Sequence, residues 1–198
     1  MKTYTIIGGV NGVGKSSLSG VLSAENSDLG IIIDTDKITQ ELGGDKIRGG
    51  KFAVKRISDC LNKGINFTQE TTLSGVRTLK TIQRAKELGY FIRLYYVGVS
   101  SSEESIVRIK NRVRKGGHNI SDQDIIRRYN KRFEDLSRVL PYCNEVRFFD
   151  NNNGFIEVAE YKNGMLIIKT EQIPQWLNDL KEYLKVYWEK NSLLIIDK

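Results

Sequence analysis

Residues 9–16 read Gly-Val-Asn-Gly-Val-Gly-Lys-Ser and match the phosphate-binding loop (P-loop) pattern G-x-x-x-x-G-K-S/T at every fixed position. The glycines of such a loop let backbone N–H groups approach phosphate oxygens, and the helix that follows adds partial positive charge. Lys15 is then expected to reach the β- and γ-phosphates, and the hydroxyl of Ser16 to face Mg²⁺. The pattern predicts a site for a nucleoside triphosphate with Mg²⁺.

The residues on either side favour a genuine site over a chance match in a glycine-rich turn. Residues 4–7 form a β-prone run that leads into the loop, and residues 17–22 can begin a helix behind it. The residues that we expect to contact the nucleotide are Gly9, Asn11, Gly12, Val13, Gly14, Lys15, Ser16 and Ser17.

Two aspartates follow a second apolar run, residues 31–33. Asp34 ends this run as a Walker B aspartate does and could hold Mg²⁺ through water, together with Ser16. Asp36 could point the same way at a substrate hydroxyl and act as general base. The alternative is that one of the two caps the helix that begins near Lys37. We favour Asp36 as the base and a capping or supporting role for Asp34.

Glu70 and Thr72 follow a third apolar run, residues 65–69. The hydroxyl of Thr72 could bond to a sugar or phosphate oxygen, so both residues are candidate substrate contacts. Capping of their own loop is the alternative.

The net charge is +7, the pI is near 9.3, and the positive residues concentrate in one window. They are Arg108, Lys110, Arg112, Arg114, Lys115, Arg127, Arg128, Lys131 and Arg132. Nucleotide kinases carry a phosphate-clamping lid at this point, so we predict a lid at about residues 108–132, with a solvated helix surface as the alternative. Arg108 and Arg112 share a helix face at i, i+4 and can aim at the transferring phosphate. His118, after two glycines, is either a donor to the substrate or a loop residue satisfied by the backbone.

Alternating strands and helices predict an α/β fold of the P-loop kinase type, with a five-stranded, mostly parallel sheet flanked by helices. Strands are expected at residues 4–7, 31–33, 65–69, 90–99 and 145–149, and helices behind the P-loop and at residues 45–62, 75–88, 102–114 and 121–140. Such sheets bind ligands at the carboxyl ends of their strands, where the P-loop, Asp34, Asp36, Glu70 and Thr72 all fall.

After Asp150 the pattern changes. Residues 155–160 and 165–169 flank an Asn-Gly pair, which is a hairpin signal. Residues 174–188 predict an amphipathic helix whose apolar stripe is Trp176, Leu177, Leu180, Leu184 and Trp188. We therefore expect a kinase domain at residues 1–150 and a C-terminal hairpin and helix, residues 151–198, docked on it.

The composition excludes several other classes of protein. No apolar run approaches the ~20 residues of a membrane span, and no apolar stretch with a cleavage site follows the first residues. Cys60 and Cys143 lack metal-type spacing, and the single His118 cannot complete a zinc set with them. We expect one soluble, cytoplasmic unit of 198 residues without a disulfide framework.

Together these motifs, which span about residues 3–152, resemble the zeta-toxin kinase family, and most of all its compact bacterial branch, often labelled predicted ABC-type ATPase. The resemblance rests on Lys15-Ser16, the Ile-Asp-Thr-Asp run ending at Asp36, Glu70-Thr71-Thr72, Gly116-Gly117-His118 and Arg128-Tyr129. The chain departs from the family in a shorter stretch between Asp36 and Glu70, and in His118, where a second arginine is expected.

The resemblance implies that ATP phosphorylates the 3′-hydroxyl of the amino sugar in UDP-N-acetylglucosamine, and that an antitoxin protein is a candidate partner. It also implies Lys15 as the phosphate-binding lysine, Asp36 as the base, Glu70 and Thr72 as substrate contacts, and Arg112 as the nearest match to a catalytic arginine. Two other functions stay open: a nucleic-acid-end kinase or RNA-binding ATPase, suggested by the charge, and a nucleotide-gated partner-binding module with little catalysis. We favour a hydroxyl-bearing small-molecule acceptor, a nucleotide sugar, over nucleic acid, and expect no membrane partner.

Overall fold

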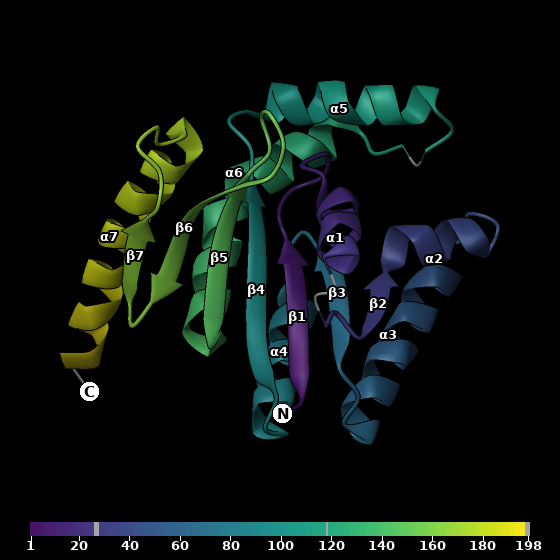
Figure 1. Cartoon of the computed structure of the whole chain (residues 1–198), viewed down its shortest axis with the longest axis horizontal. Coiled ribbons are helices and arrows are strands. Elements are labelled where there is room, and N and C mark those ends of the chain that lie inside the picture. Colours follow the sequence, from purple (N-terminus) through teal and green to yellow (C-terminus); the bar gives the residue numbers. More distant parts are fainter. Residues whose placement is uncertain (26–27, 118, 197–198) are drawn as a thin grey trace.

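The computed structural model describes residues 1–25, 28–117 and 119–196. One sheet of seven strands runs through it in the order β2-β3-β1-β4-β5-β6-β7 (Figure 1). Strands β1 to β5 are parallel, and β6 and β7 follow β5 as antiparallel strands. The strands are β1 (Thr3–Gly8), β2 (Ile31–Asp34), β3 (Phe67–Thr71), β4 (Phe91–Gly98), β5 (Glu145–Asp150), β6 (Ile156–Lys162) and β7 (Met165–Ile168).

The predicted α/β fold with a mostly parallel, helix-flanked sheet is confirmed, but the predicted number of five strands is wrong. The hairpin expected to dock on the sheet instead extends it, because β6 pairs with the free edge of β5. That pairing satisfies backbone N–H and C=O groups that β5 would otherwise leave open. Asn163 and Gly164 have φ of 54° and 81°, the left-handed conformation that the tight turn before β7 requires.

Helices cover both faces of the sheet, as parallel strands require. On one face α1 contributes Leu18 to a buried cluster. On the other face α3 and α4 contribute Ile57 and Ile82 to a larger cluster. Helices α6 and α7 add Leu136 and Leu180 to that cluster. The helices are α1 (Lys15–Ala24), α2 (Thr35–Glu41), α3 (Lys46–Lys63), α4 (Val76–Glu87), α5 (Ser102–Arg114), α6 (Asp122–Val139) and α7 (Gln175–Ile196), with a 3₁₀ turn at Leu140–Tyr142.

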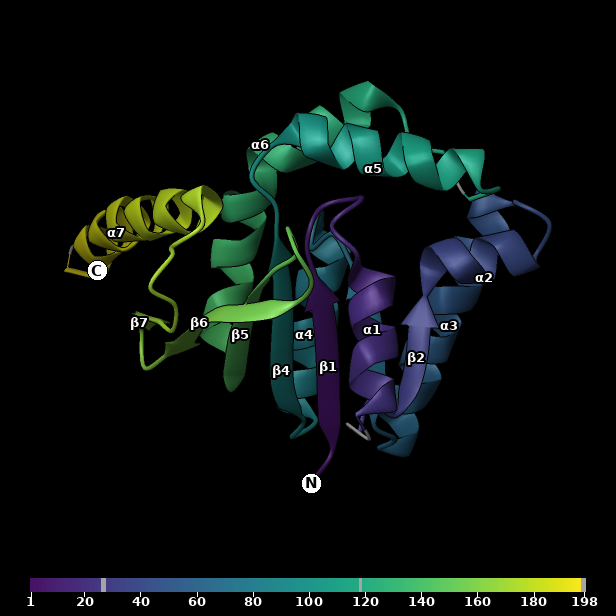
Figure 2. The same ribbon diagram turned by 45° about the horizontal axis from the view of Figure 1, so that its top comes forward.

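Helix α5 lies across the carboxyl ends of the strands, above the start of α1, and α6 returns from it along the sheet (Figure 2). Ser101 caps α5 by accepting from the backbone N–H of Glu104, and Ser121 caps α6 in the same way through Asp124. The basic window predicted from sequence therefore lies on two helices at the end of the sheet where ligands bind.

Helix α7 lies beside β6 and β7 at the opposite end of the sheet from α2 and α3 (Figure 1). The predicted stripe faces the core: Trp176, Leu177, Leu180 and Leu184 are buried, and Trp188 is partly buried. The helix runs further than the predicted residues 174–188. No helix described here combines the length and apolarity that a bilayer crossing requires.

Candidate active site

The P-loop joins β1 to α1 in a conformation that needs glycine. Gly14, the N-cap of α1, has φ 96° and ψ 27°, in the left-handed region. A Cβ at Gly9 would lie 2.5 Å from the carbonyl oxygen of Val97 on β4. The P-loop therefore packs directly on β4 and leads into the N-terminus of α1.

Lys15 is the first residue of α1, and its ammonium donates to the carbonyl oxygens of Gly9 and Val10, both at 3.0 Å. Burial lowers the pKa of Lys15 to about 8. The negative charges of Glu70, Asp36 and Asp34 raise this pKa in part. The three predicted carboxylates thus act electrostatically on the P-loop lysine, although they come from two other strand ends.

Glu70 lines the main cavity and contacts the first two turns of α1. It is buried, and its two carboxylate oxygens accept from the hydroxyls of Ser16 and Ser19, each at 2.6 Å. Burial raises its pKa, although both hydroxyls favour the ionised form. The contact follows from topology, since β3 pairs with β1 and Ile7 lies opposite Glu70 in the register.

Asp34 and Asp36 take different positions at the end of β2. The Asp34 carboxylate caps α2 by accepting from the backbone N–H groups of Asp36 and Lys37 at 2.9 and 3.2 Å. Its other oxygen accepts from the Ser16 hydroxyl at 3.3 Å. Asp36, in the first turn of α2, lines the main cavity. The structure therefore gives Asp34 a capping role and leaves the Asp36 side chain on the cavity wall.

These oxygens fit a hard divalent cation held partly by phosphate. Ser16, Asp34 and Glu70 bring a hydroxyl and two carboxylates together, and such oxygen donors suit Mg²⁺. Within residues 1–25, 28–117 and 119–196, no group of three or more His, Cys, Asp or Glu side chains could hold a metal alone. In the usual Mg²⁺ site of kinases, the nucleotide and water complete the ligand set.

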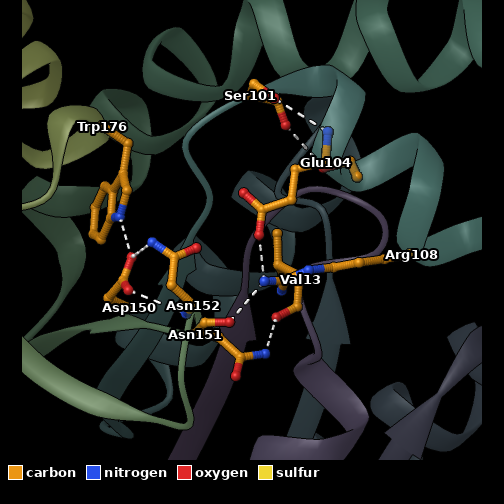
Figure 3. Close-up of polar contacts among 9 residues, drawn as sticks. Val13, Ser101, Glu104, Arg108, Asp150, Asn151, Asn152 and Trp176 are labelled. Atoms are coloured by element: carbon orange, nitrogen blue, oxygen red, sulfur yellow. Dashed lines mark hydrogen bonds and ion pairs between the residues drawn. The ribbon is translucent and has the colours of Figure 1, made fainter.

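The predicted arginines Arg108 and Arg112 both line the cavity. Arg108 pairs with Glu104 and donates to the backbone carbonyl of Asn151 at 2.7 Å (Figure 3). From α6, Arg128 donates to the side-chain oxygen of Asn11 in the P-loop at 2.7 Å. Helix α6 therefore contacts the P-loop directly, and α5 contacts the loop after β5. His118, the predicted lid donor, lies outside the described residues.

Gln69 and Arg77 are among the cavity residues that sequence reasoning missed. The hydroxyl of Tyr4 donates to the Gln69 side-chain oxygen. Arg77 stands in the first turn of α4, after the turn in which Thr72 and Ser74 share a hydrogen bond of 2.7 Å. Gln69 lies near the carboxyl end of β3 and Arg77 in the first turn of the helix that follows. Those positions were the available signal, because the carboxyl end of a strand beside β1 faces the P-loop.

These side chains share one cavity of about 580 Å³. It is lined by Asn11, Gly12, Gly14, Lys15, Ser16, Ser17, Asp34, Thr35, Asp36, Gln69, Glu70, Thr71, Thr72, Ser74, Arg77, Arg108, Ile109, Arg112 and Arg128. Every described residue that the sequence predicts for the site lines this cavity, except Gly9 and Val13 of the P-loop.

A P-loop between β1 and α1, with β3 and β4 on either side of β1, defines the fold of P-loop kinases. A family model for zeta toxins matches residues 48–156, more than half of the chain. The chain belongs to the zeta-toxin family of P-loop kinases. The matched range begins after the P-loop, so the loop pattern and the family match are separate observations.

Similar proteins include one relative in sequence and two solved structures. An uncharacterized protein of Haemophilus influenzae is 33% identical over 126 residues, which is 61% of this chain and 88% of the relative. A solved structure from the PezAT toxin-antitoxin system of Streptococcus pneumoniae has a TM-score of 0.61 and 18% identity, covering 100% of this chain and 88% of that one. The AvrRxo1-ORF1:-ORF2 complex with ATP has a TM-score of 0.60 and 17% identity, covering 93% of this chain and 63% of that one. The two structural likenesses show the fold.

Proposed function

We propose that this protein is an ATP-dependent kinase that transfers the γ-phosphoryl group of ATP to a sugar hydroxyl of a small acceptor, UDP-N-acetylglucosamine. One observation carries the proposal: Lys15, Asp36 and Arg112 line a single cavity at the carboxyl ends of the strands. Membership of the zeta-toxin family and the ATP complex of a structural neighbour support it.

In this proposal Asp36 accepts the proton of the acceptor hydroxyl as the oxygen attacks the γ-phosphorus. The new P–O bond forms while the bond to the leaving ADP oxygen breaks, and charge spreads over the phosphoryl oxygens. Lys15 and Arg112 are the cations that stabilise this charge. Ser16, Asp34 and Glu70 would hold Mg²⁺, which supplies positive charge to the β- and γ-phosphates when bound. We propose that residues 108–132 form a lid that excludes water. We also propose that residues 1–150 form the kinase domain, with the hairpin and helix of residues 151–198 docked on it.

A second cavity supports an acceptor that is larger than a single sugar. It has a volume of about 450 Å³, lies between α3 and α4, and shares Thr35, Gln69 and Arg77 with the main cavity. Its floor includes Ala53, Ile57 and Leu61, all buried.

This second cavity forms a groove between α3 and α4, and the wall that α4 provides is basic. Arg77, Lys80 and Arg84 recur at i, i+3 and i+7, so they share one face of the helix. An acceptor whose hydroxyl lies at Asp36 can therefore extend through the shared residues toward three cations. A sugar joined to a diphosphate has this combination of hydroxyl and negative charge.

Nucleic acid as acceptor is the second candidate, favoured by the basic residues of α5 and α6. Several of these basic residues already pair with acidic side chains, which makes them less available to bind nucleic acid. Lys110 pairs with Asp122 at 3.3 Å, and Arg127 pairs with Asp124 at 2.6 Å. An antitoxin protein remains a proposed partner, since the PezAT neighbour is a toxin-antitoxin system.

The test is a transfer assay with ATP, Mg²⁺ and a panel of UDP-N-acetylglucosamine, other nucleotide sugars, nucleosides and short RNA. Mass spectrometry would detect the gain of one phosphoryl group, and Lys15→Ala would serve as the inactive control. We expect a nucleotide sugar to be phosphorylated. Transfer to RNA alone, with steep salt dependence, would establish the second candidate. ATP binding without transfer to any acceptor would instead indicate a nucleotide-gated binding module.

A further inference from the structure

The loop between β5 and β6 lies directly against the P-loop. The side-chain amide of Asn151 donates to the carbonyl oxygen of Val13 at 2.8 Å. A Cβ at Gly14 would come within 2.5 Å of that amide nitrogen and 3.3 Å of the Phe155 ring. The fit is close enough that a shift of Asn151 must be accommodated by the P-loop.

The same residue also holds an arginine of α5. The backbone carbonyl of Asn151 accepts from Arg108, which in turn pairs with Glu104 one helical turn earlier (Figure 3). Asn151 therefore contacts the P-loop through its side chain and Arg108 through its backbone. One residue links two walls of the nucleotide site.

The position of Asn151 depends on the preceding residue, Asp150, which is buried at the end of β5. Its carboxylate accepts from the indole Nε1–H of Trp176 at 2.7 Å and from the backbone N–H of Asn152 at 3.1 Å (Figure 3). A buried carboxylate is unfavourable unless donors surround it, so these two bonds fix its orientation. They also fix the direction in which the chain leaves β5.

Trp176 belongs to α7, far from the P-loop in sequence, and it is almost fully buried. Its ring packs so closely on Gly98 of β4 that no Cβ fits there. Helix α7 is also held by Leu177, Leu180 and Leu184, so its apolar docking does not need the indole N–H. The N–H bond to Asp150 is an additional, directional link to the loop.

We propose that Trp176 and Asp150 are positioning residues of the nucleotide site, through which α7 sets the placement of Asn151, the P-loop and Arg108. This inference rests on the proposed function, because it requires that the P-loop bind nucleotide. It adds to that function a dependence on the C-terminal helix, none of whose described side chains, residues 175–190, lines either cavity.

The test compares Trp176→Phe with Leu180→Ala by calorimetric titration of the full chain with Mg²⁺ and ADP, well below the unfolding temperature of each variant. Trp176→Phe keeps a buried ring and removes the donor to Asp150. Leu180→Ala weakens the packing of the same helix and keeps the donor. We expect ADP to bind about 3- to 10-fold more weakly to Trp176→Phe, the usual effect of one hydrogen bond, and normally to Leu180→Ala.

Asn151→Ala provides a second measurement, including for the case in which Trp176→Phe does not fold. Asn151→Ala should weaken ADP binding to a similar extent. Where Trp176→Phe folds, the double variant Trp176→Phe/Asn151→Ala should bind ADP no more weakly than either single variant, because both substitutions act on the contact between Asn151 and the P-loop. Equal affinity of wild type, Trp176→Phe and Asn151→Ala would overturn the inference, as would equal weakening by Leu180→Ala. If the wild type itself binds no ADP, the proposed function fails and the inference fails with it.

Discussion

The carboxylate of Glu70 accepts a hydrogen bond of 2.6 Å from the hydroxyl of Ser16, the last residue of the P-loop pattern. Ser16 lies in the first turn of α1, which follows β1, and Glu70 lies near the carboxyl end of β3, which pairs in parallel with β1. Ser19, one turn further along α1, donates to the other carboxylate oxygen at the same distance. Glu70 is therefore placed to set the geometry of Ser16, the serine that we propose to hold Mg²⁺, beside the α2 cap formed by Asp34.

For Glu70→Gln, we expect the Mg²⁺ concentration that gives half-maximal transfer to rise about tenfold or more, because metal affinity depends on such supporting carboxylates. The fold should not weaken at neutral pH. The pKa of Glu70 is raised in the folded state, so the folded protein binds more protons and stability falls as pH rises above the ordinary value of 4.5. Gln removes this penalty, and thermal unfolding at neutral and acidic pH would measure the difference.

Thr72→Val is a suitable comparison, because Thr72 lines the same cavity and bonds only to Ser74 in the described contacts. Its Mg²⁺ dependence should match that of the wild type. An unchanged Mg²⁺ dependence in Glu70→Gln would mean that Glu70 only anchors α1.

The sequence predicts the parts of the site that depend on local patterns, but not the contacts that depend on which strands are neighbours. The P-loop follows from a local pattern, and Asp34 and Asp36 follow from their place after an apolar strand. The bonds from Ser16 and Ser19 to Glu70 depend on β3 lying next to β1, a pairing between segments about sixty residues apart. Nothing local in the sequence specifies that neighbour, so the sequence predicts Glu70 as a substrate contact but not its hydrogen bonds to Ser16 and Ser19.

For Lys15→Met, we expect loss of ~10²- to 10³-fold in transfer, the usual effect of removing one electrostatic contact to the charge that develops in the transition state. The variant should nevertheless be more stable near neutral pH. Burial lowers the pKa of Lys15 to about 8, below its ordinary 10.5, so the unfolded chain binds more protons between these values and wild-type stability rises with pH across that range. The full penalty is present below about pH 8, and Met removes it.

Thermal unfolding of both proteins across this pH range would test the prediction. The stability advantage of Lys15→Met should shrink as pH increases from 8 toward 10.5. A constant difference across the range would show that Lys15 is not held at a lowered pKa.

The two arginines of α5 should separate kinetically. Arg108 is held by Glu104 and by the carbonyl of Asn151, beside the P-loop. Arg108→Ala should therefore weaken ATP binding, by about tenfold. Arg112→Ala should instead lower kcat by about 10²-fold with a smaller effect on ATP binding, because a lid arginine acts on charge that develops during transfer.

Arg114→Ala is the matched control on the same helix, since Arg114 does not line the cavity and bonds to Asn111 at 3.5 Å. It should leave kcat and ATP binding close to wild type. Weakened ATP binding with normal kcat in Arg112→Ala would assign Arg112 to nucleotide docking.

Charge reversal on α4 would test whether the groove between α3 and α4 binds the acceptor. Lys80→Glu should raise the KM for an anionic acceptor about 2- to 5-fold, the range for one exposed charge, and should leave the KM for ATP unchanged. Lys86→Glu is the control, because Lys86 lies on the same helix but bonds to Asn144 outside the groove. Equal effects of the two variants on the acceptor KM would indicate a general electrostatic effect.

The sequence predicts the five parallel strands closely but not the seven-stranded sheet. Apolar runs and caps such as Ser121 mark each element locally. Whether residues 156–168 pack as a separate hairpin or extend the sheet depends on the free edge of β5, which only the assembled sheet presents. The same applies to Gln69 and Arg77, whose place in the cavity follows from β3 and α4 meeting the P-loop.

Asp36 is the residue that separates a kinase from a nucleotide-binding module. Asp36→Asn should keep the fold and the ATP affinity, since Asn has nearly the same shape and Asp36 contributes only its backbone N–H to the α2 cap. It should lose about 10²- to 10⁴-fold in transfer, the usual contribution of a general base. The loss can fall at the lower end, because a loose phosphoryl transition state uses the base late.

The measurement is the transfer rate of wild type and Asp36→Asn with UDP-N-acetylglucosamine or another acceptor that the wild type phosphorylates, together with the affinity of each for ADP. Asp34→Asn is the comparison: its carboxylate caps α2 and lies 3.3 Å from Ser16, so its loss should appear in Mg²⁺ dependence and helix stability. If the protein arrests bacterial growth on expression, Asp36→Asn should relieve the arrest. Equal transfer by wild type and Asp36→Asn would exclude Asp36 as the base and leave Asp34 and Glu70 as the carboxylates to test, because both lie within reach of Ser16 at the same end of the sheet.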